Sequence, residues 1–230
     1  MRKINVLGIN LRDYSVRESL RRINLYLNNN QCNTIDFVTH NVLLLAAGSE
    51  ELTGNIEKMD MTVLATPDIL QAAGVSSHSR EKEIENNLLL KGIFRKLAKE
   101  KRKIYLLSEN QDSLSELALG MGQFSNELYV VGNSVPGDSE ENDDTIVNDI
   151  NSVIPDVILT NLPSPNAEKF ISDNRKRMNV KLAVIIRDVS LKTTEDGKVK
   201  KGGLRGFLMR KFFHSAAANY VKDSERKNIN

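Results

Sequence analysis

Several residue types are scarce in this sequence, and each shortage excludes a class of protein. It has one cysteine, Cys32, so no disulfide forms within the chain and a reducing compartment is allowed. No apolar run approaches the roughly 20 residues that a membrane-spanning helix needs. The polar residues Asn10 and Arg12 come too early for the apolar region of a signal peptide. We therefore expect a cytoplasmic protein whose only membrane contact is peripheral.

A dominant charge is also lacking. The 230 residues include 32 basic and 30 acidic side chains, and the formal net charge is +2. No recognition motif accompanies the basic residues, so nucleic acid is not an expected partner. His78 and His214 have no cysteine or carboxylate at metal-ligand spacing, so no metal site is expected. With 40% hydrophobic and 27% charged residues, the chain has the composition of an ordinary globular protein with a proper core.

Apolar, β-branched segments alternate with segments of helical period along most of the chain. This alternation predicts an α/β fold, with a mainly parallel, Rossmann-like sheet and helices on both faces. We expect strands at 4–9, 34–38, 61–65, 103–107, 127–131, 156–160 and 181–186, and helices at 16–27, 42–47, 50–58, from 66 onward, 87–101, 113–124, 146–154 and 166–178. Ser15 and Glu18 form a capping-box pattern, and Thr66 is placed to cap the helix that Pro67 begins. The polar segment 75–85 is predicted to be a surface loop or a mobile flap, and the acidic segment 132–144 to be a solvated loop.

The segment 155–178 (PDVILTNLPSPNAEKFISDNRKRM) is the expected ligand site. An apolar strand runs into a loop with Pro163 and Pro165, and a helix begins at about Asn166. In an open α/β sheet, ligands bind in the crevice at the carboxyl ends of the strands. A helix N-terminus there presents free N–H groups that suit an anion such as a sugar-nucleotide diphosphate.

The composition changes after residue 190, which suggests an α/β domain at 1–190 and a basic amphipathic C-terminal appendage at 191–230. Residues 193–203 are typical of a hairpin or linker, and residues 204–221 have a helical pattern that interleaves aromatic and basic side chains. Three arrangements are open for this helix: packing as an ordinary terminal helix, docking on anionic lipid, or binding an acceptor diphosphate. Arg205, Arg210 and Lys211 are the candidates for membrane or diphosphate contact.

Five blocks of the sequence, in order and spacing, resemble the WecG/TagA/CpsF family of bacterial glycosyltransferases. The blocks are INVLGINLRDYSVRESLRRI, VTHN, KIYLLSENQDSLSELA, PDVILTNLPSPNAEKFISDNR and GKVKKGGLRGFLMRKFF. The resemblance implies transfer of an N-acetylmannosamine-type sugar from a UDP donor to a polyprenyl-diphosphate-linked acceptor at the inner face of the cell membrane. Such enzymes build wall teichoic acid linkage units, enterobacterial common antigen, capsule or exopolysaccharide. It implies no metal or other cofactor.

The resemblance also implies substrate-binding residues. The family pattern Thr-x-Asn after the second strand is kept as Thr39 and Asn41, although both residue types are also ordinary helix caps. In the later loop Pro165, Glu168 and Lys169 are kept, and a glutamate in a first helical turn also suits the helix dipole.

Four family positions are changed at the expected pocket. The Pro-Asp-Gly turn that carries the family's proposed base falls on Leu64-Ala65-Thr66, and its arginine segment falls on 83–86, which begins with Glu83. The family's glutamine is Ala167, and the glycine-rich turn after the last strand is 186–189 (IRDV).

The residues therefore do not establish by themselves that the protein is catalytically active. Asp68 and His40 are the candidate catalytic groups, each with an alternative structural role. One hypothesis is an active hexosyltransferase; another is a catalytically inactive member that binds an active glycosyltransferase or a lipid-linked intermediate; a third is a rearranged pocket for another donor. Each allows a homo- or hetero-oligomer.

Overall fold

The computed structural model describes residues 1–136, 143–187 and 204–227, and its centre is a six-stranded parallel sheet. The strand order is β4-β3-β8-β7-β5-β6. The strands are β3 (Asn33–Val38), β4 (Met61–Leu64), β5 (Lys103–Leu107), β6 (Tyr129–Ser134), β7 (Val157–Thr160) and β8 (Leu182–Ile185). The expected α/β, Rossmann-like fold is confirmed.

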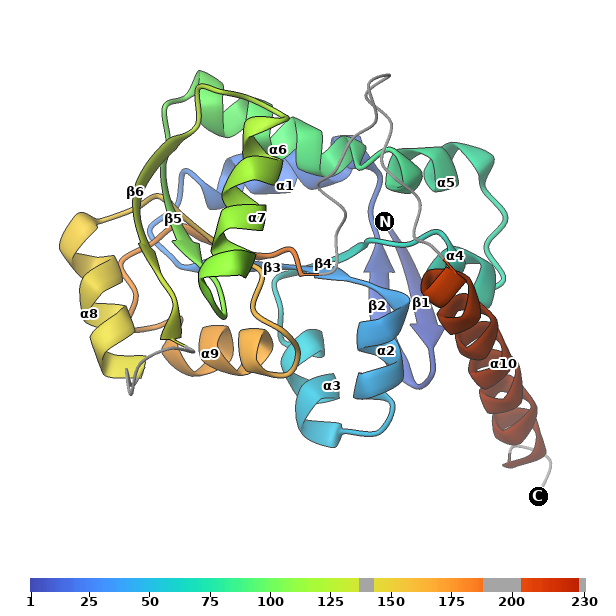
Figure 1. The fold of residues 1–230 in the computed structure, drawn as a ribbon. Coiled ribbons are helices and arrows are strands. Elements are labelled where there is room, and N and C mark those ends of the chain that lie inside the picture. Colours follow the sequence, from blue (N-terminus) through green and yellow to red (C-terminus); the bar gives the residue numbers. More distant parts are fainter. Residues whose placement is uncertain (137–142, 188–203, 228–230) are drawn as a thin grey trace.

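Helices cover both faces of this sheet (Figure 1). One face carries α1 (Val16–Tyr26), α6 (Leu88–Lys99) and α7 (Gln111–Gly122), and the other carries α8 (Asp143–Val153) and α9 (Asn166–Asn174). A third group surrounds the β3–β4 edge: α2 (His40–Ala46), α3 (Glu50–Glu57), α4 (Asp68–Ala72) and α5 (His78–Glu85). The capping box of α1 is formed as predicted, with the Ser15 hydroxyl and the Glu18 carboxylate each bonded to the other residue's main chain.

The inner strands are buried on both faces, as a covered parallel sheet requires. In β3 the side chains of Ile35 and Phe37 enter the core beneath α1 and α6, whereas Val38 joins the cluster around α2. Because strand side chains alternate, Asp36 points to the second face, where it is fully buried. A buried carboxylate needs a charged or hydrogen-bonding partner, and the site described below supplies it.

The prediction of a single strand at 4–9 was wrong. This segment is part of an antiparallel hairpin of β1 (Arg2–Val6) and β2 (Ile9–Asp13), separate from the main sheet. The two turn residues, Leu7 and Gly8, have φ values of 54° and 84°. Positive φ at both positions matches the twist of a two-residue hairpin. The sequence pattern does not reveal this turn, because Leu7 continues the apolar run of the strand before it.

The surface loop predicted at 75–85 is largely helical, since α5 spans His78–Glu85. The sequence has little helical period there, and the helix is held by tertiary contacts. Ile84 is buried in the core, and Arg80 donates hydrogen bonds to Asp13 at 2.7 and 3.2 Å. The predicted cap of α4 was also wrong: Pro67 is at the N-cap position, and the Thr66 hydroxyl makes no hydrogen bond to a described residue.

Other predicted boundaries shift by a few residues. Three residues of the predicted 132–144 loop, Gly132–Ser134, belong to β6, and Asp143 and Asp144 begin α8, while 137–142 lie outside the described residues. The last helix, α10 (Leu204–Lys227), continues beyond the predicted end at 221. The predicted hairpin or linker at 193–203 also lies outside the described residues.

Helix α10 rests on its own chain. Phe213 and Ala217 are buried among side chains of α2 and α4, and Tyr220 lies close to Gly8 in the β1–β2 turn. Figure 1 shows the helix crossing the edge formed by α2, α4 and the hairpin. In the described part of the chain, no helix combines the length and apolarity needed to cross a membrane.

Candidate functional site

The carboxyl ends of four neighbouring strands bring the candidate residues to one edge of the sheet. The segments that follow β4, β3, β8 and β7 contain Asp68, His40, Arg187 and Glu168 respectively. Parallel strands end on the same side, so segments distant in sequence meet there. This is the edge at which the sequence predicts ligand binding.

A fully buried ion cluster lies at the centre of this edge. Arg187, just past β8, donates from Nη1 to Asp36 Oδ1 at 2.9 Å and from Nη2 to Asp36 Oδ2 at 3.3 Å. Its Nη2 is also 2.5 Å from Oε1 of Glu168 in the first turn of α9. Two carboxylates thus share one guanidinium, and the side chains of all three are at most 3% exposed. The bidentate geometry with Asp36 is the strongest form of such a pair.

Glu168 is the member of the ion cluster whose charged form is disfavoured by its surroundings. Burial, followed by the nearby charge of Asp36, raises the pKa of its carboxyl, and the opposing effects of Arg187 and the Ser164 hydroxyl do not cancel this. Ser164 donates to Oε1 at 2.7 Å, whereas Oε2 is buried and finds no partner in the described ranges. A protonated carboxyl would relieve the excess negative charge.

The loop after β7 is fixed by its own polar contacts. Ser108, at the end of β5, donates to Asn161 Oδ1 at 2.6 Å, and Asn161 Nδ2 donates to the Ser113 carbonyl at 3.0 Å. The Leu162 amide also bonds to the Thr160 hydroxyl at 3.2 Å. These bonds hold the loop that contains Ser164 and leads into α9, where Glu168 lies.

His40 and Asp68 meet at the ends of β3 and β4. His40 Nδ1 is 3.3 Å from Asp68 Oδ2, and both side chains are 10% exposed. The distance suits an ion pair or a long hydrogen bond, but the two groups are not aligned as a regular hydrogen bond. The ring of Phe213 from α10 packs against the imidazole, with 5.7 Å between ring centroids.

Buried polar atoms without partners gather beside this pair. His40 Nε2, Asn41 Oδ1 and Thr66 Oγ1 are each shielded from solvent, and none is hydrogen-bonded to a residue that the structure describes. Thr39 differs, because its hydroxyl accepts a 3.4 Å hydrogen bond from the Val42 amide and caps α2. Buried polar groups are normally satisfied, so unsatisfied atoms on three residues that follow the ends of two paired strands point to a ligand that supplies their partners.

Ala65 and Glu83 line a small cavity next to β4. Its volume is about 20 Å³, enough for one water molecule. Arg80, which also lines it, is ion-paired with Glu83 and with Asp13. Burial lowers the pKa of the Arg80 guanidinium, but the hydrogen bonds to these two carboxylates outweigh it and raise the pKa. The Glu83 carboxylate is therefore neutralised by a cation one helical turn earlier.

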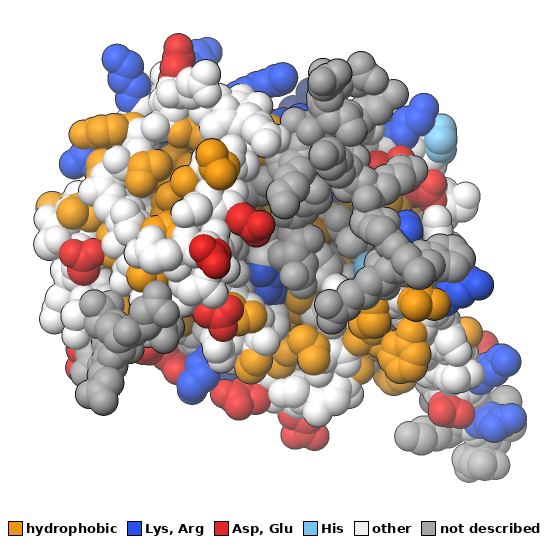
Figure 2. Space-filling model, in the orientation of Figure 1, with side chains coloured by type: hydrophobic (Ala, Val, Ile, Leu, Met, Phe, Trp, Pro, Cys, Tyr) orange, Lys and Arg blue, Asp and Glu red, His pale blue; other side chains and the backbone are white. Residues whose placement is uncertain are grey.

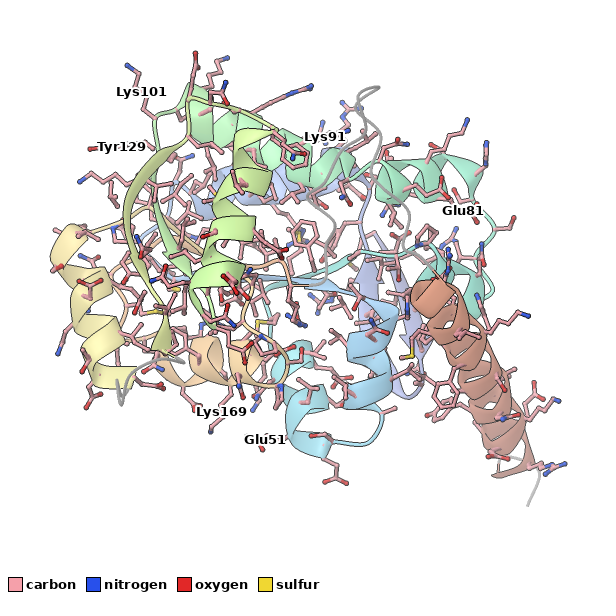
Figure 3. The ribbon with its side chains drawn as sticks, in the orientation of Figure 1. Glu51, Glu81, Lys91, Lys101, Tyr129 and Lys169 are labelled. Atoms are coloured by element: carbon pink, nitrogen blue, oxygen red, sulfur yellow. The ribbon has the colours of Figure 1, made fainter. Side chains whose placement is uncertain are left out.

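The remaining predicted residues belong to α9 and α10. Pro165 is at the N-cap position of α9. Lys169 points away from the strand ends; its side chain is 60% exposed and pairs with Asp173 at 3.1 Å and with Glu51 at 3.9 Å (Figure 3). Arg210 is half-buried and Lys211 exposed on α10, while the side chain of Arg205 is outside the described part.

Two members of the ion cluster were missed as site residues by the sequence interpretation. Asp36 was treated only as part of a strand, and Arg187 only as a bulky replacement for glycine. A charged residue inside the apolar run TIDFV is a usable signal, because a carboxylate there must find a cation. The identity of that cation was not accessible, because 151 positions separate the two residues.

Comparison with protein families gives one result. The model of the glycosyl transferase WecG/TagA/CpsF family matches residues 4–189. The chain belongs to this family. No curated protein matches the chain.

The matched range includes the sheet, the ion cluster, and the His40–Asp68 pair, and it ends before α10. Family membership indicates a glycosyltransferase role in cell-envelope polysaccharide biosynthesis, with a sugar donor and an acceptor as substrates.

Proposed function

We propose that this protein transfers an N-acetylmannosamine-type sugar from a UDP donor to a polyprenyl-diphosphate-linked acceptor. The observation that carries the proposal is the group of unsatisfied buried polar atoms on His40, Asn41 and Thr66, at the strand ends of a chain that belongs to this family. A site that held no ligand would leave these atoms without hydrogen bonds, each at an energetic cost of about 1–3 kcal/mol.

The segments around the strand ends also suit such substrates. The adjoining loop is fixed by Ser108 and Asn161, and the ion cluster locks β3, β8 and α9 together. A rigid frame of this kind holds polar groups in place for a substrate, which reduces the entropy lost on binding.

We place the reaction at the cytoplasmic face of the membrane, with peripheral contact through α10. Leu208 and Phe212 on this helix are 58% and 62% exposed, next to the exposed Lys211, and Leu45 of α2 is 56% exposed. Figure 2 shows hydrophobic side chains at the boundary between α2 and α10. An apolar face with flanking cations is the composition that favours anionic lipid surfaces.

A catalytically inactive, partner-binding role is the second candidate function. It is favoured by Ala65, which puts a methyl group at the position of the family's proposed base, and by Arg187, whose guanidinium is already bound by two carboxylates of its own chain. In that role the same surfaces would bind an active glycosyltransferase or the lipid-linked intermediate.

The test measures donor binding and transfer separately. Thermal unfolding of the whole chain is followed with UDP, UDP-N-acetylmannosamine and, as the control, CMP; product formation is then measured with a synthetic polyprenyl-diphosphate-linked acceptor. A saturable rise in the midpoint with the two uridine compounds, together with product, supports the transferase. Binding without product supports the inactive member, and an unchanged midpoint with no product contradicts the transferase.

A further inference from the structure

The sequence puts His40 and Asp68 together through strand pairing. Val38 of β3 is paired with Leu64 of β4, and the Ala65 amide continues the ladder by donating to the Val38 carbonyl at 2.9 Å. The chain then turns into α2 at His40 and into α4 at Asp68. Each residue is the first of its helix, so both side chains emerge at the same strand edge.

Helix α10 packs against this pair, and the His40 and Asp68 side chains are each only 10% exposed. The fully buried ring of Phe213 lies on the imidazole, and His214 follows it on α10, with its ring 5.9 Å from that of Phe213. Asp68 is the one carboxylate that the structure records in an ion pair with His40. In such a place a carboxylate fixes the ring orientation and stabilises the imidazolium that forms when the other nitrogen accepts a proton.

Neither ring nitrogen of His40 makes a regular hydrogen bond to a described residue, but Nδ1 faces Asp68, whereas Nε2 has no recorded partner. Nε2 is buried, and Asn41 Oδ1, on the next residue, and Thr66 Oγ1, two residues before Asp68, are also unsatisfied in the described part of the chain. A histidine with Nδ1 toward a carboxylate and Nε2 unoccupied has the arrangement of a general base. Such hydrogen bonds are often long without substrate and shorten when it binds, as the 3.3 Å separation allows.

We propose that His40 is the general base of the sugar transfer, held in position by Asp68, and that this pair replaces the carboxylate absent at Ala65. The inference rests on the proposed transferase function and names its base. It also assigns separate roles: His40 is a catalytic residue that touches the acceptor, and Asp68 is a positioning residue that acts through it.

In the proposed step, the acceptor hydroxyl oxygen attacks C1 of the donor sugar. A new C1–O bond forms as the bond from C1 to the UDP oxygen breaks, and that electron pair leaves with UDP. The acceptor hydroxyl proton passes to His40 Nε2, and the resulting imidazolium is stabilised by Asp68. Attack opposite to the leaving group inverts C1, and the proton is released to solvent after the products leave.

The test compares variants at saturating donor and acceptor, with donor affinity measured by calorimetry. A positioned base contributes about 100- to 10,000-fold to the rate, so His40→Ala and the near-isosteric His40→Gln should lower kcat by that factor and leave donor Kd within about 3-fold. Asp68→Asn should lower kcat by up to about 10,000-fold, since it removes the charge that selects the tautomer. The control His78→Ala, an exposed histidine on α5, should change kcat less than 2-fold, a margin of about 0.4 kcal/mol.

Chemical rescue separates catalysis from structure. Added imidazole should restore part of the rate of His40→Ala in a saturable manner, and it should not restore Asp68→Asn, which still carries its own imidazole. Full activity of both His40 variants beside an active wild type would overturn the base assignment and leave the transferase intact. A lowered rate that imidazole does not restore in His40→Ala, with His40→Gln retaining wild-type kcat, would also overturn it. A wild type that neither binds UDP-sugar nor forms product overturns the transferase, and the base with it.

Discussion

Arg187 holds Asp36 in a bidentate ion pair across the sheet, with N–O distances of 2.9 and 3.3 Å and both side chains almost completely buried. Asp36 lies in the middle of β3 and Arg187 just past the end of β8, so the pair joins two adjacent strands on the face that α9 covers. Neither residue could be buried alone, because an uncompensated charge in the core is strongly unfavourable.

Removal of this guanidinium should destabilise the fold. Arg187→Met leaves Asp36 and Glu168 as buried carboxylates without their cation, and the expected loss is about 3–5 kcal/mol in the free energy of unfolding. Urea denaturation at neutral pH measures it. The matched control is Arg177→Met, because Arg177 forms its ion pair with Asp144 at the surface, where the expected effect is below about 1 kcal/mol. Equal losses for the two variants would contradict the structural role of Arg187.

Glu168 should give the stability of the protein a pH dependence that glutamine does not have. Burial and the Asp36 charge raise the pKa of its carboxyl above 4.5, so the folded state holds this proton more tightly than the unfolded state. The contribution of Glu168 to the free energy of unfolding is therefore fully present below pH 4.5, falls as pH rises toward the raised pKa, and is constant above it.

Glu168→Gln resembles the protonated carboxyl and keeps an oxygen for Ser164 and Arg187. The difference in free energy of unfolding between this variant and wild type should shift in favour of glutamine as pH rises above 4.5. Denaturation series at closely spaced pH values measure it. A difference that is independent of pH would show that the carboxyl titrates alike in the folded and unfolded states.

Adjacent phenylalanines on α10 offer a matched pair of variants. Phe213 is fully buried against α2 and α4, whereas Phe212 is 62% exposed. Phe213→Ala should cost about 3–5 kcal/mol of stability, and Phe212→Ala less than about 0.5 kcal/mol. Thermal and urea unfolding check both values, and both variants carry the same change in helix propensity. If α10 does not dock on its own chain, the two variants will have similar stability.

Membrane binding should depend on Phe212, the exposed residue of the two. Phe212→Ser should weaken cosedimentation with anionic vesicles, since it removes an exposed apolar side chain beside Lys211. The measurement compares vesicles with and without anionic lipid at low and high salt. Unchanged cosedimentation of Phe212→Ser would contradict lipid contact through this face of α10.

Cys32 should react slowly with thiol reagents in the folded protein. Burial raises the pKa of its thiol to about 11, and the residue is 8% exposed. At pH 8 the thiolate fraction is then about 100-fold or more below that of an ordinary cysteine, so labelling should slow by at least that factor. A Cys32→Ser, Ser115→Cys variant, with its thiol on an exposed position of α7, gives the reference rate. Labelling of Cys32 as fast as this reference would exclude the buried environment.

Local patterns predicted most of the fold. The Ser15–Glu18 capping box was predicted and is formed, because it depends on two side chains three positions apart. The parallel sheet followed from apolar segments such as 156–160 that alternate with segments of helical period. The hairpin at 2–13 and helix α5 did not follow, because a turn with an apolar first residue and a helix held by distant contacts leave little local signal.

The sequence named several residues of the candidate site but not the contacts between them. His40 and Asp68 were named separately, one as a histidine at a turn and the other as a helix-dipole residue. The structure brings them to 3.3 Å because β3 and β4 are parallel neighbours, and it moves Lys169 to the solvent face of α9.

The sequence by itself determined most of the strands and helices, the α/β fold class and the family. Those properties depend on periodicity and on residues close together in the chain. Only the tertiary structure decided that Arg187 neutralises Asp36 and that Phe213 covers His40. Such pairs lie more than 150 residues apart, and their choice depends on which buried groups the packed sheet and helices bring within contact distance.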